Sequence, residues 1–243
     1  MTRKIILRVL FFMLVAIIAS CGSDENDPVR VNFDVRFELN TQQPAHFSFS
    51  RLAVSIHSLR FVGTRQTGND VVFNTRPGQA VGFFDLNPSR FLVPVTWFDI
   101  PEGVYNSMRW ELATRAMDDD IYHDDDPFSL DDYGMVIFGS YTRVNGAFTN
   151  LIIALDPADV LKFDSFNAQN QLPVTLIFGN TYSAEVVINP FAIMGAVPRS
   201  MLEQAEFSEE DEGFYLVISS DENEDIYSLL LLSLSRNLRV IVK

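Results

Sequence analysis

Hydrophobic and polar residues alternate strictly at the start of the body of the chain. Val31, Phe33, Val35, Phe37 and Leu39 are apolar, and one polar residue stands between each of them and the next. Successive side chains of a strand point to opposite faces, so this two-residue period predicts a strand with one buried and one solvated face. Such strands are typical of antiparallel sheets.

A second, longer run of the same kind extends from Phe47 to Val62. Its alternation holds through Ile56 and resumes out of phase at Leu59, which predicts a β-bulge or bend near His57-Ser58. Further short runs rich in strand-forming residues, each bounded by turn residues, are Val71 to Asn74, Val81 to Leu86, Phe91 to Ile100, Val104 to Thr114, Met135 to Arg143, Ala147 to Leu155, Val174 to Phe178 and Tyr182 to Ile188.

The regular spacing of these runs predicts a mainly β chain, with an antiparallel β-sandwich over residues 31–190. The clearest local hairpin signal is Val144-Asn145-Gly146. There we expect a type I′ turn, whose two central residues both need a positive φ. No helix of ordinary length is indicated before about residue 190.

The C-terminal residues, 191–243, have a different pattern. We expect a short helix from Pro198 to Glu206, since proline is favoured in a first helical turn, and a strand from Phe214 to Ile218. A helix from Ile226 to Leu238, preceded by serines and acidic residues, and a closing strand from Arg239 to Val242 follow. This α/β segment would pack on the sandwich. The alternative is a long apolar hairpin, because a run of leucines suits either element.

Composition supports a folded chain. Of the 243 residues, 47% are hydrophobic and 21% charged, which excludes the compositions of disordered and collagen-like proteins. The chain is long enough to bury a core without disulfides, and its one cysteine could form none within the chain.

That cysteine follows a secretory leader. Residues 1–20 combine a basic start with an apolar run from Val9 to Ile18, which is too short to cross a bilayer as a helix. The sequence Ile18-Ala19-Ser20-Cys21 resembles the lipobox of bacterial lipoproteins, in which the cysteine thiol is linked to diacylglycerol. Residues 21–30 would then be the lipidated Cys21 and an acidic tether. The run Ser23-Asp24-Glu25 resembles the export signal of Bacteroidetes lipoproteins, which implies a lipid-anchored protein of the outer membrane, exposed at the cell surface.

A second resemblance lies in the body. The segments from Leu52 to Gly63, Phe84 to Leu86, Phe98 to Tyr105 and Met108 to Leu112 resemble uncharacterised bacterial lipoproteins with β-sandwich domains of prealbumin or immunoglobulin type. In them a strand ends in a Pro-x-Gly turn and a tyrosine opens the next strand. The resemblance implies a fold and a location, but no site residues. Related sandwich lipoproteins act as adhesins, fimbrial components or glycan-binding proteins.

Net charge limits the partners. The whole chain carries −14, and removal of the leader with its three basic residues leaves 15 basic against 32 acidic residues. Phosphate-backbone recognition depends on clustered Lys and Arg, and none is seen along the sequence, so nucleic acid is excluded as a partner. An anionic bilayer would repel this chain, which leaves Cys21 as its one evident membrane contact.

An aspartate cluster is the most unusual feature. Eight aspartates lie within residues 118–132, without a Lys or Arg among them. Mutual repulsion would be relieved by a divalent cation, and Ca²⁺ accepts irregular sets of oxygens. The candidate ligands are Asp118, Asp120, Asp124, Asp126 and Asp131. The spacing differs from that of an EF-hand, and a solvated acidic loop without an ion remains the simpler interpretation.

Catalytic patterns are missing. There is no GxSxG, no phosphate-binding glycine loop and no paired-histidine metal motif, while carboxylates alone give weak support for glycoside hydrolysis. Among the aromatic residues, Tyr122 and Tyr133 stand close to aspartates and are expected to be exposed contacts for a glycan or protein partner. We therefore expect a non-catalytic binding module. The alternatives are an assembly subunit of a surface complex and, less supported, a carbohydrate-active enzyme.

Overall fold

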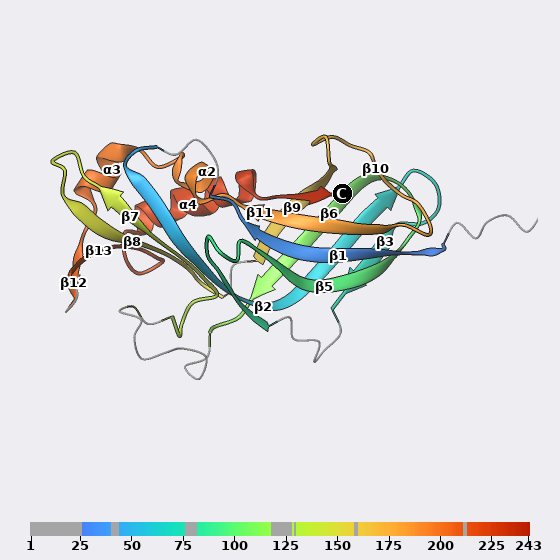
Figure 1. The fold of residues 1–243 in the computed structure, drawn as a ribbon, viewed down its shortest axis with the longest axis horizontal. Coiled ribbons are helices and arrows are strands. Elements are labelled where there is room, and N and C mark those ends of the chain that lie inside the picture. Colours follow the sequence, from blue (N-terminus) through green and yellow to red (C-terminus); the bar gives the residue numbers. More distant parts are fainter. Residues whose placement is uncertain are drawn as a thin grey trace, which may run out of the picture.

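The computed structural model describes residues 26–39, 44–75, 82–117, 128, 130–157, 160–210 and 213–243. Of these residues, 56% lie in strands and 13% in helices, which confirms the prediction of a mainly β chain. Within these described ranges, fourteen strands form one large sheet, and three helices cover part of it (Figure 1).

Eleven strands follow one another across the sheet in the order β12-β13-β8-β7-β2-β6-β9-β14-β11-β1-β5, while β3 and β4 pair with β2 and β10 pairs with β6. Their bounds are β1 Pro28–Phe37, β2 Phe47–Arg65, β3 Val71–Asn74, β4 Gly82–Leu86, β5 Leu92–Pro101, β6 Gly103–Thr114, β7 Met135–Thr142, β8 Phe148–Leu155, β9 Val160–Asn167, β10 Val174–Leu176, β11 Thr181–Ile188, β12 Ser208–Glu210, β13 Gly213–Ile218 and β14 Arg239–Val242. The pairs β1–β11, β8–β13 and β9–β14 are parallel. The sheet is therefore mixed, and the expectation of a purely antiparallel arrangement is corrected.

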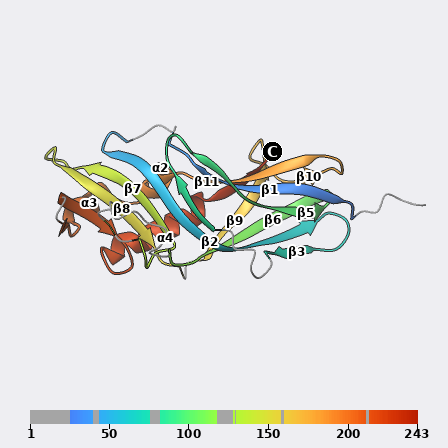
Figure 2. The ribbon, with the colours of Figure 1, turned by 60° about the horizontal axis from the view of Figure 1, so that its bottom comes forward.

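Part of the sheet folds back on itself around Trp110, which is fully buried. The ring of Phe33 on β1 lies 4.9 Å from the Trp110 ring on β6, and that of Phe98 on β5 lies 5.7 Å from it. Neither β1 nor β5 is hydrogen-bonded to β6, so these contacts place two layers face to face (Figure 2). The Trp110 indole N–H donates to the buried Ser165 Oγ at 2.6 Å.

Strand β9 connects the two layers. Its first residues, 160–164, pair with β6, and residues 165–167 pair with β14 in the other layer. Among the inward-facing positions of β9 is a polar residue, the buried Ser165. Its hydroxyl is not left without a partner, because it accepts the hydrogen bond from Trp110. No strand was predicted over residues 160–167, because a polar serine at an inward position interrupts the alternation of apolar and polar residues.

Strand β2 contains the expected bulge. Its register with β6 shifts between Ile56 and Ser58, and the His57 side chain between them is exposed. One extra residue moves the later side chains to the opposite phase, which explains why Leu59 and Phe61 are buried after the shift. The prediction at His57-Ser58 is confirmed.

Strands β7 and β8 form the predicted hairpin, but its turn is of another type. Gly146 alone has a positive φ, 84°, while Asn145 does not. The Gly146 N–H donates to the Arg143 carbonyl at 3.0 Å, and the Arg143 N–H donates to that of Ala147 at 2.9 Å. These bonds fit a type I turn followed by a left-handed glycine, so the type I′ prediction was wrong. The Asn145 side chain accepts a hydrogen bond from the Ala147 N–H, and this bond stabilises the observed turn.

Three helices lie beside the other part of the sheet, over β7, β8 and β13 (Figure 1). They are α2 (Pro190–Met194), α3 (Arg199–Gln204) and α4 (Glu224–Asn237). The last two, and strands β13 and β14, were expected within residues 191–243, so the alternative of a long apolar hairpin does not hold. Helix α2 was not predicted. It begins after Asn189, whose side chain accepts from the Ala192 N–H.

Both faces of this part are covered by apolar residues. Leu151, Ile153 and Leu216 face the main core, which includes Ile226 and Leu230 of α4. The opposite face carries a second cluster, made of Ala53, Met117, Leu130, Val136, Ile152, Ala154, Tyr215 and Val217. Strands β13 and β14 both pair with strands that precede residue 191, so the C-terminal residues are hydrogen-bonded into the same sheet.

Candidate functional site

Helix α4 has a hollow of the surface at each end, and the two hollows carry opposite charge. The hollow beside its N-terminus, the acidic cavity, has a volume of about 430 Å³ and is lined by the carboxylates of Glu206, Glu224 and Asp225. The hollow beside its C-terminus, the basic cavity, has a volume of about 510 Å³ and is lined by Arg109, Lys162, Arg236, Arg239 and one carboxylate, Asp164.

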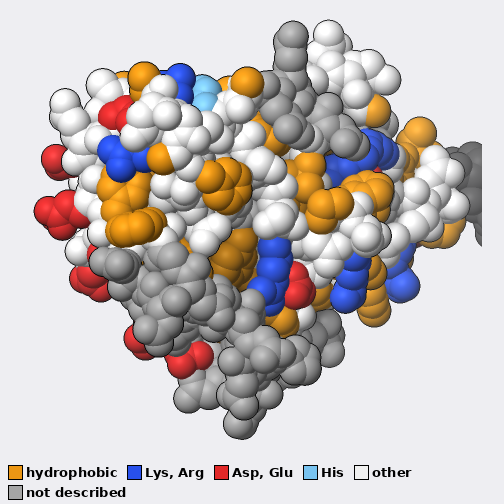
Figure 3. All heavy atoms as spheres, turned by 60° about the vertical axis from the view of Figure 1, so that its left-hand side comes forward, with side chains coloured by type: hydrophobic (Ala, Val, Ile, Leu, Met, Phe, Trp, Pro, Cys, Tyr) orange, Lys and Arg blue, Asp and Glu red, His pale blue; other side chains and the backbone are white. Residues whose placement is uncertain are grey.

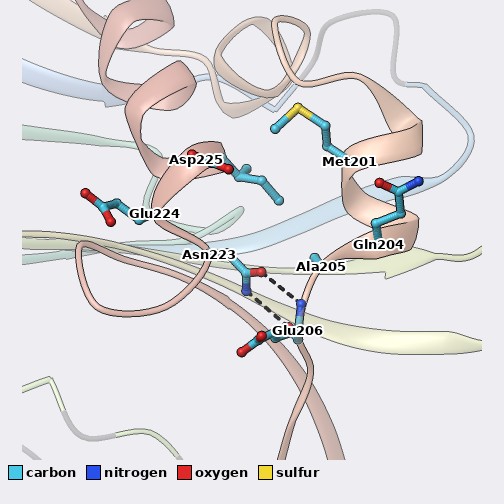
Figure 4. A pocket seen from close by; sticks show the side chains of 8 residues that line it. Met201, Gln204, Ala205, Glu206, Asn223, Glu224 and Asp225 are labelled. Atoms are coloured by element: carbon cyan, nitrogen blue, oxygen red, sulfur yellow. Dashed lines mark hydrogen bonds between the residues drawn. The ribbon is translucent and has the colours of Figure 1, made fainter.

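Hydrogen bonds from the Asn223 side chain hold the backbone segments around the acidic cavity together. Asn223 has a left-handed backbone, with φ 58° and ψ 45°, and it precedes the first residue of α4. Its side-chain oxygen accepts from the Glu206 N–H at 2.9 Å, and its amide donates to the Glu206 carbonyl at 3.1 Å and to the Val217 carbonyl at 2.7 Å. Figure 4 shows the two bonds between Asn223 and Glu206, which link the segment after α3 to the start of α4.

The helix dipole accounts for the charge of the acidic cavity. Glu224 and Asp225 stand in the first turn of α4, where the unpaired backbone N–H groups attract negative charge. The carboxylates therefore stabilise the helix. In the residues that the structure describes, no group of three or more His, Cys, Asp or Glu side chains could hold a metal ion.

The basic cavity brings together four cations from three distant parts of the chain. Arg109 comes from β6, Lys162 from β9, Arg236 from the last turn of α4 and Arg239 from the start of β14. The dipole of α4 favours a cation at the position of Arg236 alone. The other three belong to strands, so helix electrostatics do not explain the group.

Neighbouring groups neutralise this charge only in part. Arg109 Nε donates to Asp164 Oδ1 at 3.1 Å, and Lys162 Nζ lies 3.8 Å from a carboxylate oxygen of Glu111. Arg239 donates to the neutral side chain of Asn170 at 3.4 Å. Arg236 has no hydrogen-bonding or charged partner among the described residues. The cavity thus holds excess positive charge in a chain whose net charge is −14.

A cluster around Glu203 fixes the position of α3. The Tyr141 hydroxyl donates to a carboxylate oxygen of Glu203, and the Val144 N–H donates to the same oxygen at 2.9 Å. Arg143 lies 3.4 Å from the other oxygen. The hydrogen bond from Tyr141, followed by those from Val144 and Arg143, lowers the pKa of Glu203 below its ordinary value. Burial raises the pKa of Tyr141. This cluster ties α3 to the β7–β8 hairpin.

Most of the residues proposed from the sequence lie outside the described residues. These are Cys21, Asp118, Asp120, Asp124, Asp126 and Tyr122. Asp131 is described: it stands half-buried in a turn before β7. Its role as a calcium ligand stays a prediction.

Tyr133 is half-buried, whereas an exposed ring was expected. It stacks on Phe128 with 5.7 Å between the ring centroids and packs against the second apolar cluster. Burial raises the pKa of its hydroxyl, and a hydrogen bond with Ser219 lowers it in part. Much of the ring is thus used in packing, and its role in ligand contact stays a prediction.

Charged side chains are unevenly distributed over the surface. Figure 3 shows one end of the molecule, on which acidic side chains gather along the left margin and most Lys and Arg side chains lie further right. In the part of the chain that the structure describes, no helix is long and apolar enough to cross a membrane.

The basic cavity was not predicted from the sequence, because no two of its strand cations are near each other in the chain. The only local signal was the pair Arg236 and Arg239, three residues apart at the end of a predicted helix. Comparison with known proteins finds no matching family model, no matching curated protein and no matching solved structure.

Proposed function

We propose that this chain is a lipid-anchored surface protein whose body is a non-catalytic binding module, and that its basic cavity takes an anionic sugar. The observation that carries the proposal is the convergence of Arg109, Lys162, Arg236 and Arg239 on one hollow. Guanidinium groups bind carboxylates and sulfates through paired, charge-assisted hydrogen bonds, which are stronger than neutral ones.

The size and lining of the cavity support a sugar as the ligand. A volume of about 510 Å³ lies within the range of small-molecule sites. Phe166 and Leu238 add apolar surface beside the cations, and Ser235 and Asn170 add hydroxyl and amide groups. Apolar, hydrogen-bonding and cationic groups together match a carboxylated or sulfated sugar.

Binding of a sulfated disaccharide to the full chain, measured by calorimetry, tests this function. Arg236→Gln should weaken binding about tenfold or more, since a hydrogen bond to a charged group contributes about 1.5–3 kcal/mol. Arg90→Gln is the matched control, because Arg90 is also an exposed arginine but lies outside the cavity. Equal affinity for the unsulfated disaccharide, or equal losses in both variants, would contradict an anion site.

The lipid anchor at Cys21 is tested separately. Export of the full chain in a bacterium that processes lipoproteins should give a membrane-bound product whose N-terminal peptide carries acyl chains by mass spectrometry. Cys21→Ser should release the body into the aqueous fraction, since two or more acyl chains supply the stable attachment. A Cys21→Ser protein that stays membrane-bound would contradict the anchor.

Calcium binding by the aspartates of residues 118–132 belongs to this proposal as a stabilising element. A ligand that binds only the native state raises the melting temperature. We expect millimolar calcium to raise the Tm of the full chain and a chelator to reverse the rise. An unchanged Tm would leave the aspartates as a solvated loop.

The sheet edges argue against the alternative of an assembly subunit that receives a strand. At the two ends of the main strand order, β12 has three residues and β5 contains Pro94 and Pro101. Short edge strands and prolines, which have no N–H, protect an edge from further pairing. Recovery of filaments of this chain from cell surfaces would favour the alternative.

We also infer a prealbumin- or immunoglobulin-like relationship for the two layers around Trp110. Tyr105 is fully buried at the start of β6, and its hydroxyl donates to the Pro101 carbonyl at 2.7 Å. A tyrosine that bonds backbone a few residues upstream, next to a strand turn, is a feature of immunoglobulin-type sandwiches. Burial raises the pKa of this hydroxyl to about 12.

A further inference from the structure

Two large apolar side chains stand at the tip of the turn between β10 and β11. Ile177 and Phe178 are 55% and 56% exposed. The Asn180 N–H donates to the Ile177 carbonyl at 3.2 Å, and Gly179 has a φ of 84°, which a tight turn with glycine at its third position requires. Turn tips are normally polar, so two bulky apolar residues there need an explanation.

This turn lies beside the point at which the chain enters the fold. The Phe178 N–H donates to a carboxylate oxygen of Glu102 at 3.1 Å, and the Glu102 N–H donates to the Asp27 carbonyl at 2.9 Å. Arg30, near the start of β1, is paired with Thr181, near the turn. Figures 1 and 2 both show the start of β1 and the start of β11 at the same end of the molecule.

Arg65 holds the entering chain at this end. It is 9% exposed, and its guanidinium donates to the Asn26 side chain at 3.2 Å and to the Asn69 carbonyl at 3.0 Å. The same group lies 3.5 Å from the Glu102 carbonyl. One side chain thus joins the β2–β3 loop, the β5–β6 turn and the first described residue. The position of Asn26, at which the described part of the chain begins, is therefore fixed by the fold.

The length of the tether limits how far this end can stand from an anchor. Asn26 follows Cys21 by five residues, and five extended residues span at most roughly 18 Å. The headgroup region of one leaflet is only roughly 5–8 Å thick. A lipid on Cys21 would therefore keep the end with Ile177 and Phe178 close to the bilayer.

We propose that Ile177 and Phe178 form a second membrane contact, which dips into the lipid headgroup region and orients the body. The proposal rests on the proposed lipid anchor at Cys21, and it adds a contact where the sequence indicated the acyl chains alone. The body then stands with the β7–β8 hairpin, at the other end in Figures 1 and 2, pointing away from the membrane.

Site-specific probes test the orientation. Cys21 is the only cysteine and would be acylated, so Phe178→Cys gives one thiol for an environment-sensitive fluorophore. Phe148→Cys is the matched control, since Phe148 is also an exposed phenylalanine, 69%, and lies at the β7–β8 end. The lipidated full chains are reconstituted into phosphatidylethanolamine–phosphatidylglycerol vesicles that carry nitroxide lipids.

We expect the probe at position 178 to shift to shorter wavelength and to lose at least half of its emission to the nitroxides, and the probe at 148 to change little. Ile177→Glu, a change at an exposed turn, should reduce that quenching. Flotation with the vesicles but equal quenching at both positions would overturn the membrane contact and leave the anchor intact. Failure to float would overturn the anchor and this inference together. A wavelength shift that is as large in the unlipidated Cys21→Ser chain, in buffer without vesicles or detergent, would assign the tip to a second copy of the chain and also overturn the membrane contact.

Discussion

The two cavities at the ends of α4 differ in how their charge is used. The acidic cavity is built on a turn with three side-chain hydrogen bonds, and its carboxylates complement a helix N-terminus. The basic cavity gathers four cations, one of which has no partner among the described residues. The first arrangement is explained by folding stability, whereas the second is not. This difference is the reason why we propose the basic cavity, rather than the acidic one, as a binding site.

A matched pair of asparagines allows the difference to be measured. Asn223 and Asn170 are the two described non-glycine residues with a positive φ, 58° and 60°, and each lines one cavity. The largest effect is expected for Asn223→Ala, about 2–4 kcal/mol of unfolding free energy, because three hydrogen bonds are lost and a left-handed alanine is strained. Denaturant unfolding measures it. Asn223→Gly should recover only the strain, and a loss below about 1 kcal/mol would contradict the structural role.

Asn170→Ala should cost less, about 1–2 kcal/mol, since strain is added and only the 3.4 Å contact with Arg239 is lost. Asn170→Gly should restore most of the stability. Unfolding midpoints of the two variants, compared with the Asn223 pair, check this order. An Asn170→Gly protein as unstable as Asn170→Ala would show that the side chain holds the basic cavity together.

Removal of one charge at each end of α4 separates stability from binding. Glu224→Gln and Arg236→Gln should each cost about 0.3–1 kcal/mol, because each charge complements the helix dipole. With the sulfated disaccharide present, the wild type and Glu224→Gln should gain thermal stability through ligand binding, and Arg236→Gln should gain less. Thermal scans with and without the disaccharide measure both effects. An equal rise in Tm with the disaccharide in all three proteins would contradict a binding role for the basic cavity alone.

The smallest expected effect is the pH dependence of stability that comes from Glu203, which fixes α3 beside the acidic cavity. The folded-state pKa of Glu203 is lowered, so its contribution to stability is present above the ordinary pKa of about 4.3 and is lost as pH falls through the lowered value. Stability should therefore fall more steeply below pH 4 in the wild type than in Glu203→Gln. Urea midpoints between pH 7 and pH 3 test this, and identical slopes would mean that Glu203 does not couple α3 to the hairpin.

Local patterns predicted the elements whose residues repeat regularly. The alternation from Val31 places β1, the change of phase at His57 places the bulge, and the apolar residues after Ile226 place α4. The type of the β7–β8 turn was not predictable in this way, because the Asn145 side chain decides it through a bond to Ala147.

Pairings between distant strands could not be predicted, since they leave no periodic trace. Strand β1 pairs in parallel with β11, roughly 150 residues away, and β14 joins β9 and β11 from the far end of the chain. The basic cavity depends on these pairings: Arg239 and Lys162 line the same cavity because β14 lies beside β9. A search for basic clusters along the sequence therefore found none.

The position of β14 has a consequence for biogenesis. This strand follows all the others along the chain, yet it occupies an interior slot between β9 and β11. Neither β9 nor β11 can complete its backbone hydrogen bonds until residues 239–242 are present. Pairing of strands that are distant in the chain costs conformational entropy, and the contacts that offset this cost form only when the last strand is added. A chain that emerges N-terminus first would therefore leave β9 and β11 without their shared neighbour until residues 239–242 follow.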